Sequence, residues 1–173
     1  MIFVTVGTQL PFDRLLAAID DWAFANPGEQ IIAQTGVTTV SSPRIDARPF
    51  VDGSTFRELV QQADVLVAHA GMGSILTAVE FAKPVIVMPR RADLGEHRND
   101  HQLATVQNLA HLSNLEIVQD AQTLSSVLDK QLGAGPLEKL REGISDGHRR
   151  LVGEISNFIA GGSLGGTLTF GEA

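Results

Sequence analysis

The segment VLVAHAGMGS, residues 65–74, decides the fold. Its first four residues form an unbroken apolar run, which is typical of a strand that is buried on both faces of a sheet. The glycines that follow predict a turn, and the apolar spacing beyond them predicts a helix to about residue 82. A second apolar strand is predicted at residues 85–88, so the segment has the strand–helix–strand order of a parallel sheet.

The same alternation of short apolar strands with helices continues toward both ends of the chain. Strands are predicted at residues 2–6, 31–33 and 115–118, and helices at residues 12–24, 54–62, 99–111, 122–131 and 136–159. Ser54 is the predicted cap of its helix, and residues 37–49, rich in Thr, Ser and Pro, predict a loop with room for a short strand. We therefore expect one α/β, Rossmann-like domain with a mostly parallel sheet over residues 1–160, followed by a Gly-rich flexible tail at residues 161–173.

The composition excludes several classes of protein. The chain of 173 residues carries a formal charge of −7 and has no cysteine. Its acidity argues against a nucleic-acid-binding protein, because such proteins neutralise phosphates with clustered Lys and Arg. Without cysteine, neither disulfides nor thiolate metal sites can form. No apolar run approaches the ~18 residues of a transmembrane helix, and residues 1–6 lack the features of a signal peptide, so we expect a cytoplasmic protein.

The glycine turn is the first candidate binding site. Ligands of open parallel sheets bind at the carboxyl ends of the strands, where Gly71 and Gly73 allow a phosphate close to the N–H groups of the helix start. A tight turn with Ser74 as a helix cap explains these residues equally well. Glu80 favours a ligand, because it follows Gly73 by two helical turns, roughly 10 Å along nearly the same face. A carboxylate there can accept both hydroxyls of a ribose whose phosphates lie at the helix start.

Polar residues also follow two other predicted strand ends. Arg90, Arg91 or Arg98 suits a phosphate or a sugar carboxylate, although for each arginine alone loop solubility is the better explanation. His101 and Gln102 fall in the first turn of the next helix, where they suit hydrogen bonds to sugar hydroxyls. Gly7 and Thr8 follow the first strand and are expected to line the same crevice. A second histidine precedes His101 by four residues, but no third ligand is evident, so no metal site is predicted.

Taken together, these segments resemble the donor-binding C-terminal domain of glycosyltransferase family 28. The likeness covers about residues 1–160 and keeps the order of the motifs. The matching pieces are IFVTVGT at 2–8, HAGMGS at 69–74, Glu80, KP at 83–84, VMP at 87–89 and NDHQ at 99–102. The run GEHRNDHQ at 95–102 is similar to split members of the family, which include Alg13-type subunits and bacterial PssE- or EpsF-like exopolysaccharide proteins.

The resemblance implies the fold of the C-terminal half of a GT-B glycosyltransferase and a UDP-sugar donor. The donor-binding residues that it implies are Gly7, Thr8, Gly71, Met72, Gly73, Ser74, Glu80, Arg90, His101 and Gln102. Among these, the glycine turn with Ser74 lies at the diphosphate and Glu80 holds the ribose. His101 and Gln102 take the place of a Gln-Gln pair that contacts the sugar in a bacterial cell-wall relative, and His101 departs from that pattern. The family inverts the anomeric centre without a bound metal, so no cofactor is expected.

An inverting transfer needs a base for the acceptor hydroxyl and an electrostatic clamp for the departing diphosphate. This chain can supply the clamp, and His69 is its best candidate for the base, although a histidine at a strand end more often packs against a loop. The resemblance places the base and the acceptor site on a membrane-associated partner subunit of the Alg14 or PssD type. That partner is expected to recruit this cytoplasmic chain to the inner face of the membrane.

The expected function is therefore that of the donor-binding subunit of a two-component UDP-sugar-dependent hexosyltransferase, which adds a sugar to a lipid-linked glycan in exopolysaccharide biosynthesis. The main alternative is a non-catalytic stimulatory subunit of a partner glycosyltransferase, although the intact Glu80 and glycine turn speak against it. The bacterial likeness and the arginines favour glucuronic acid, with glucose, galactose and N-acetylglucosamine open. The apolar seam of the predicted helix 136–159 is either core or a docking face, which if exposed favours a homodimer of the isolated chain.

Overall fold

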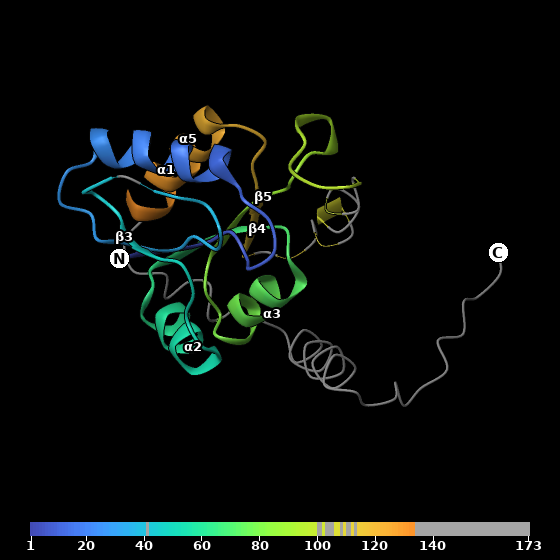
Figure 1. Ribbon diagram of the computed structural model, residues 1–173. Coiled ribbons are helices and arrows are strands. Elements are labelled where there is room, and N and C mark those ends of the chain that lie inside the picture. Colours follow the sequence, from blue (N-terminus) through green and yellow to red (C-terminus); the bar gives the residue numbers. More distant parts are fainter. Residues whose placement is uncertain are drawn as a thin grey trace, which may run out of the picture.

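The computed structural model describes residues 1–40, 42–99, 102, 106, 107, 109, 112 and 114–133. Within this part, six strands form one sheet in the order β3-β2-β1-β4-β5-β6, and every neighbouring pair is parallel (Figure 1). The strands are β1 (Ile2–Thr5), β2 (Ile31–Gln34), β3 (Asp46–Arg48), β4 (Val65–His69), β5 (Val85–Met88) and β6 (Leu115–Ile117). The predicted Rossmann-like α/β fold is confirmed, and the loop predicted at residues 37–49 does contain a short strand.

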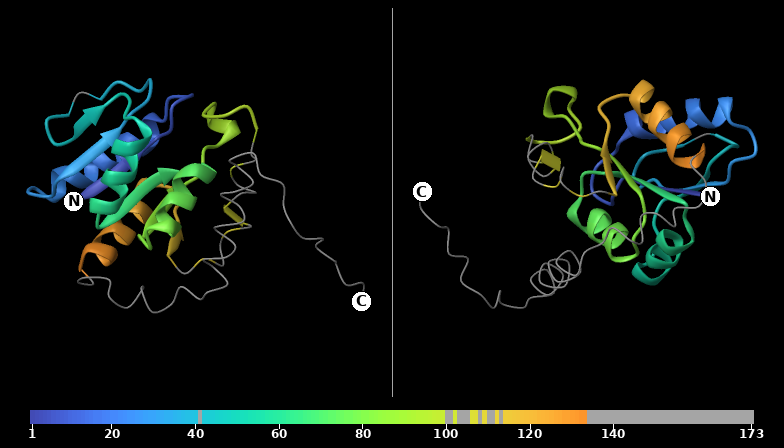
Figure 2. Two further views of the ribbon diagram at one scale, coloured as in Figure 1. Left: turned by 90° about the horizontal axis from the view of Figure 1, so that it is seen from below. Right: turned by 180° about the vertical axis from the view of Figure 1, so that it is seen from behind.

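Helices cover both faces of the sheet. The described helices are α1 (Asp13–Ala25), α2 (Gly53–Gln62), α3 (Met72–Glu80) and α5 (Ala121–Gly133), with a 3-10 turn η1 (Ala92–Leu94). Helices α1 and α5 lie on one face, and α2 and α3 lie on the other (Figures 1 and 2). Trp22 Nε1 of α1 donates a 2.8 Å hydrogen bond to Asp129 Oδ1 of α5, which joins these two helices.

Alternation along the central strand explains why both layers are needed. In β1, Ile2 and Val4 belong to the core beneath α1 and α5, whereas Phe3 belongs to the core beneath α2 and α3. All three side chains are completely buried. Burying a side chain of this size contributes about 1.5–3 kcal/mol, so the unbroken apolar runs of the sequence stabilise two cores at once.

The start of α2 differs from the prediction, because its cap is Asp52 and not Ser54. Asp52 has the extended backbone of a cap, and its carboxylate accepts a hydrogen bond from the Thr55 N–H at 3.0 Å. The Ser54 hydroxyl lies inside the first turn and donates to the same carboxylate. An acidic cap has two acceptor oxygens and complements the helix dipole, so Asp52 takes the role expected of the serine.

Several predicted elements lie partly or wholly outside the described residues. The helix predicted at residues 99–111 is described only at isolated positions, and the helix at 136–159, the tail at 161–173 and the domain boundary at 160 are not described. The predicted helix at 122–131 is confirmed as α5. Among the described helices, none combines the length and the apolarity that crossing a bilayer requires.

Candidate functional site

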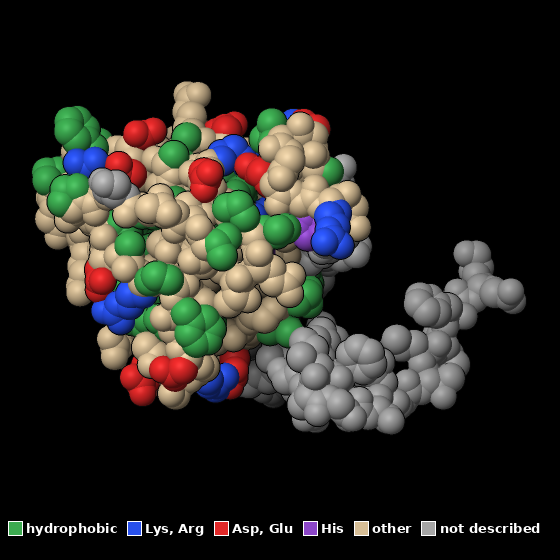
Figure 3. Space-filling view, in the orientation of Figure 1, with side chains coloured by type: hydrophobic (Ala, Val, Ile, Leu, Met, Phe, Trp, Pro, Cys, Tyr) green, Lys and Arg blue, Asp and Glu red, His purple; other side chains and the backbone are tan. Residues whose placement is uncertain are grey.

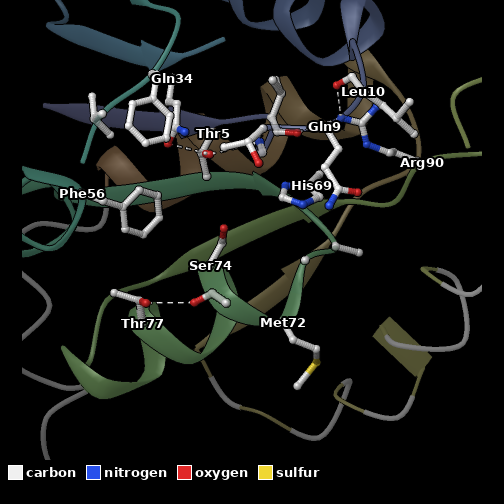
Figure 4. Close-up of a pocket in the computed structure, with 18 of the residues that line it drawn as sticks. Thr5, Gln9, Leu10, Gln34, Phe56, His69, Met72, Ser74, Thr77 and Arg90 are labelled. Atoms are coloured by element: carbon white, nitrogen blue, oxygen red, sulfur yellow. Dashed lines mark hydrogen bonds between the residues drawn. The ribbon is translucent and has the colours of Figure 1, made fainter. Parts of the chain in front are cut away.

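The strand order places a crevice between β1 and β4. After β1, the chain continues to β2 on one side of the sheet. After β4, it continues to β5 on the other side, so the connections diverge between β1 and β4. Ligands of doubly wound sheets bind outside the carboxyl ends of the strands at such a switch point. A cleft of about 790 Å3 lies there, lined from the β1 end by residues 5–10 and from the β4 end by residues 69–74 (Figure 4). That volume suits a ligand as large as a nucleotide sugar.

The imidazole of His69 lies between two glycines at the base of this cleft. A Cβ atom added at Gly7 would lie 2.8 Å from His69 Cε1, and one added at Gly71 would lie 2.7 Å from the same atom and closer still to Nε2. Real Cβ atoms essentially never approach that closely. The two glycines are therefore required by the ring that lies between them, and Gly7 also has a left-handed backbone with φ of +79°.

His69 is uncharged at neutral pH. Its Nδ1 atom is buried and has no hydrogen-bond partner in the described part of the chain. Burial, together with the positive charge of Arg90, lowers the pKa of His69 to about 4. The ring therefore enters the cleft as a neutral imidazole, which has one donor and one acceptor nitrogen and binds a further proton weakly.

The start of α3 forms the opposite wall. Gly71 is the N-cap residue, so Met72, Gly73 and Ser74 form the first turn, whose N–H groups have no partners within the helix. All four residues line the cleft, and Ser74 is largely buried with its hydroxyl directed into it (Figure 4). The N–H groups and the helix dipole together favour an anion at this position. The interpretation of Ser74 as a plain N-cap is wrong, because the helix begins two residues earlier.

Arg90 lies at the carboxyl end of β5 and is 2% exposed. Its Nη2 donates to the carbonyls of Val6 and Leu10 at 2.7 Å each, and its Nη1 donates to the carbonyls of Pro11 and Glu96. The guanidinium also lies 4.6 Å from the centre of the Phe12 ring. The structure thus gives four main-chain acceptors to the residue that the sequence assigned to phosphate. Direct contact between Arg90 and a donor stays a prediction.

Glu80 lies at the far end of α3, where it is paired with Arg57 of α2. The two carboxylate oxygens accept from the two Nη atoms at 2.7 and 2.8 Å. The Arg57 guanidinium holds the pKa of Glu80 below its usual range, so the carboxylate is ionised at neutral pH. Arg57 lines the cleft, and its partner Glu80 lies just outside the lining residues.

The charged side chains that line the described part of the cleft are all positive. Among the described residues that line it, Arg57 and Arg90 are cationic, and no Asp or Glu is present. The whole chain is acidic, and in the space-filling view its Asp and Glu side chains lie in the upper and lower parts of the face shown (Figure 3). A cleft lined by one sign of charge concentrates ligands of the opposite sign, so this one favours an anion.

Most of the predicted donor-site residues meet in this cleft. It is lined by His69 and by Gly7, Thr8, Gly71, Met72, Gly73, Ser74, Arg90 and Gln102. The Gln102 side chain accepts a 3.0 Å hydrogen bond from the Arg90 backbone N–H, which ties the two predicted residues together. His101 lies outside the described residues. The described part of the chain contains no group of three His, Cys, Asp or Glu side chains arranged to hold a metal ion.

Sequence reasoning missed the residues that line the cleft from the β3 side. Phe50, Phe56 and Arg57 lie there, together with Gln34 at the end of β2. The signal that could have found them is the position of Phe50 just beyond β3, since every parallel strand delivers its carboxyl end to the same edge. Aromatic rings at that end give the cleft an apolar, flat-sided region suited to a planar base.

Comparisons with known proteins agree with this geometry. The model of the glycosyltransferase family 28 C-terminal domain matches residues 1–142. The chain is 33% identical over 110 residues to the UDP-N-acetylglucosamine transferase subunit ALG13 of Mus musculus, covering 56% of this chain and 9% of that protein. It is 30% identical over 112 residues to the UDP-N-acetylglucosamine–N-acetylmuramyl-(pentapeptide) pyrophosphoryl-undecaprenol N-acetylglucosamine transferase of Hydrogenovibrio crunogenus, covering 60% of this chain and 30% of that enzyme.

Solved structures show the same fold at low identity. MurG of Acinetobacter baumannii superposes with a TM-score of 0.61 at 18% identity, covering 90% of this chain and 49% of that chain. The glycotransferase of kitacinnamycin gives a TM-score of 0.61 at 19% identity, covering 90% of this chain and 42% of that one. The chain thus has the Rossmann-like fold of one half of a GT-B glycosyltransferase and spans only part of each relative. Since the family model covers most of its length, this chain belongs to the glycosyltransferase family 28 C-terminal domain family.

Proposed function

We propose that this chain is the donor-binding subunit of a two-component inverting glycosyltransferase, and that it binds a UDP-sugar in the cleft between β1 and β4. The observation that carries the proposal is the meeting, in one cleft, of the N–H groups of a helix start, the Ser74 hydroxyl and charged side chains that, among the described lining residues, are all cationic. Those groups suit a diphosphate. In this arrangement the start of α3 stabilises the negative charge that develops on the departing nucleotide.

The proposed place of the ribose is the Glu80 end of α3. A helix rises about 1.5 Å per residue, so the seven positions from Gly73 to Glu80 span roughly 10 Å, the reach from a diphosphate to a ribose. An ionised carboxylate has about four acceptor positions, and the Arg57 pair uses two of them. Two acceptor positions are then left for ribose hydroxyls, and the rings of Phe50 and Phe56 are available to the uracil.

We place the catalytic base on a partner subunit. A general base works best when its pKa lies near the working pH, and the pKa of His69, about 4, is too low for that role. His69 is better suited to a hydrogen bond with the donor. The relatives named ALG13 are transferase subunits, which supports a partner of the Alg14 or PssD type. We propose that this partner binds the lipid-linked acceptor and brings the chain to the membrane.

The names of the relatives favour N-acetylglucosamine as the transferred sugar. Both ALG13 proteins and the bacterial enzyme are named as N-acetylglucosamine transferases, whereas glucuronic acid was favoured from the arginines. The structure weakens that argument, because the Arg90 guanidinium donates to four carbonyls and Arg57 pairs with Glu80. We therefore propose UDP-N-acetylglucosamine first, with UDP-glucuronic acid as the direct competitor and exopolysaccharide assembly as the pathway expected from the bacterial likeness.

Calorimetric titration tests the proposal. The purified chain is titrated with UDP, ADP, UDP-N-acetylglucosamine and UDP-glucuronic acid, and the titrations are repeated with Glu80→Gln. We expect selective UDP binding, weakened by about 1–3 kcal/mol in the variant through loss of a charged hydrogen-bond acceptor. Glu58→Gln is the matched control, since Glu58 is exposed on α2 and does not line the cleft.

The outcomes separate the two candidate functions. Equal binding of UDP and ADP would refute uracil recognition. If the chain binds nothing alone, the titration is repeated with the partner present. Donor binding that appears only then and depends on Glu80 supports a shared donor site, whereas binding that is indifferent to Glu80 points to a stimulatory subunit.

A further inference from the structure

The Arg90 side chain connects the loop after β1 with the loop after β5 at the base of the cleft. Its side chain reaches the carbonyls of Val6, Leu10 and Pro11 in the loop after β1, and that of Glu96 in the loop after β5. Its backbone N–H is bound by Gln102. The side chain thus joins the distant loop after β1 to the loop in which Arg90 itself lies, and Figure 4 shows it beside Leu10 at one end of the cleft.

In the described part of the chain, main-chain hydrogen bonds do not hold the middle of the loop after β1. Among the described residues, no main-chain to main-chain hydrogen bond involves residues 7–11. The loop is fixed at its ends, where Gly7 N–H donates to Thr5 Oγ1 at 3.2 Å and Phe12 N–H donates to Thr38 Oγ1 at 2.8 Å. Between these points, the carbonyls of Leu10 and Pro11 accept hydrogen bonds from the Arg90 guanidinium.

The guanidinium is satisfied by carbonyl dipoles and not by a carboxylate. The nearby Glu96 carboxylate is held by Arg14, at 2.7 and 2.8 Å, and by the Arg91 backbone N–H at 2.9 Å. A planar fork with several donors can hold several carbonyls at once, whereas the single ammonium of a lysine cannot reproduce that geometry.

We infer that Arg90 is a positioning residue, which fixes residues 7–10 as a wall of the donor cleft by binding the carbonyls of that loop, and that it does not bind the donor phosphates itself. The part of the inference that concerns the donor rests on the proposed function. The part that concerns the loop stands without it. With the loop ordered in advance, the donor need not order it on binding.

The experiment compares Arg90→Lys with the wild type by two-dimensional amide NMR, first without any ligand. We expect the amide signals of residues 7–10 to shift or broaden, while those of β2, on the far side of β1, keep their positions. Arg44→Lys is the matched control, because Arg44 also binds through its fork, to Asp20, and lies over a ring, that of Phe24, away from the cleft. Signals of residues 7–10 that match the wild type in Arg90→Lys would overturn the inference.

A second measurement separates positioning from mere structural support. In Arg90→Ala, added guanidinium at low millimolar concentration is expected to restore the signals of residues 7–10, whereas methylammonium is not. Failure of guanidinium to restore them, in a variant shown by circular dichroism to be folded, would contradict the role assigned to the fork.

Donor binding is measured last. UDP affinity is expected to fall about tenfold in Arg90→Lys, the factor that corresponds to ordering one loop residue on binding. Weakened UDP binding with an unchanged loop would instead assign Arg90 to the phosphates and overturn the inference. If the wild type binds no UDP, the proposed function fails while the NMR result still decides whether Arg90 holds the loop.

Discussion

Replacing Gly71 with alanine tests the contact at the base of the cleft. Gly71 has φ of −89° and ψ of 129°, which any residue adopts, so alanine brings no backbone strain. The whole cost comes from its Cβ, which would lie 2.7 Å from His69 Cε1 and closer to Nε2. The ring cannot retreat easily, because Gly7 lies against its other side. Forcing an extra carbon into such a site costs about 1–3 kcal/mol.

The assay is urea unfolding followed by the fluorescence of Trp22, the single tryptophan, which is 3% exposed. With a urea dependence of about 2 kcal/mol per molar, the midpoint is expected to fall by about 1 M. Gly73→Ala is the matched control, since its added Cβ would meet nothing within 4 Å. Alanine also favours a helix over glycine, so that midpoint is expected to stay or rise.

A double-mutant cycle with His69→Ala identifies the cause. Once the ring is removed, the Gly71→Ala change is expected to cost less than about 0.5 kcal/mol, which leaves a coupling energy of about 0.5 kcal/mol or more. Equal costs with and without the ring would refute the reasoning. They would show that Gly71 is needed for some other reason than the imidazole.

Three further predictions use the same unfolding assay. The pKa of His69 is about 4 in the folded protein and about 6.5 in an unfolded chain, so the unfolded chain binds the proton more readily between these values. The free energy of unfolding is therefore expected to be unaffected above about pH 6.5 and to fall by up to about 3 kcal/mol as the pH drops to about 4. His69→Gln should flatten that part of the pH profile. Glu96→Gln removes the half-buried ion pair with Arg14 and should cost about 1–3 kcal/mol, whereas Glu116→Gln, in an exposed pair, should change stability by less than about 0.5 kcal/mol; equal effects would refute the distinction. Ile86→Ala in β5 should cost about 2–5 kcal/mol, because Ile86 is completely buried, and a smaller loss would mean that the core refills the cavity.

The elements that the sequence predicted well are those with strong local signals. The apolar run at residues 65–68 and its repeat at 85–88 specify strands because nothing but a doubly covered sheet buries such runs. β3 was only suggested, because Asp46–Arg48 is short, polar and largely exposed. Its pairing with β2 is decided by the neighbouring strand, which no local pattern reveals.

The candidate site was predictable where it follows strand ends and less so where side chains meet across the fold. The glycine turn at residues 71–74 is predictable from its residue types. Glu80 and Arg57 are 23 positions apart in the sequence and lie on different helices, so no local pattern predicts their pairing. Arg57 alone is typical of a solvated helix face. The sequence identifies Arg90 as a candidate site residue but does not predict its carbonyl partners, because every residue has a main-chain carbonyl whatever its type.

The central position of β1 has a consequence for how the protein is made. Ile2 pairs with Ile31 on one side and with Val65 on the other, so β1, which is synthesised before both partners, completes its pairing only after β4 has emerged. Until then, the apolar face of α1 has no finished sheet to cover. Such distant pairing slows folding and leaves apolar surface open to association. The nascent chain is thus expected to need protection by chaperones while the residues between β1 and β4 are synthesised.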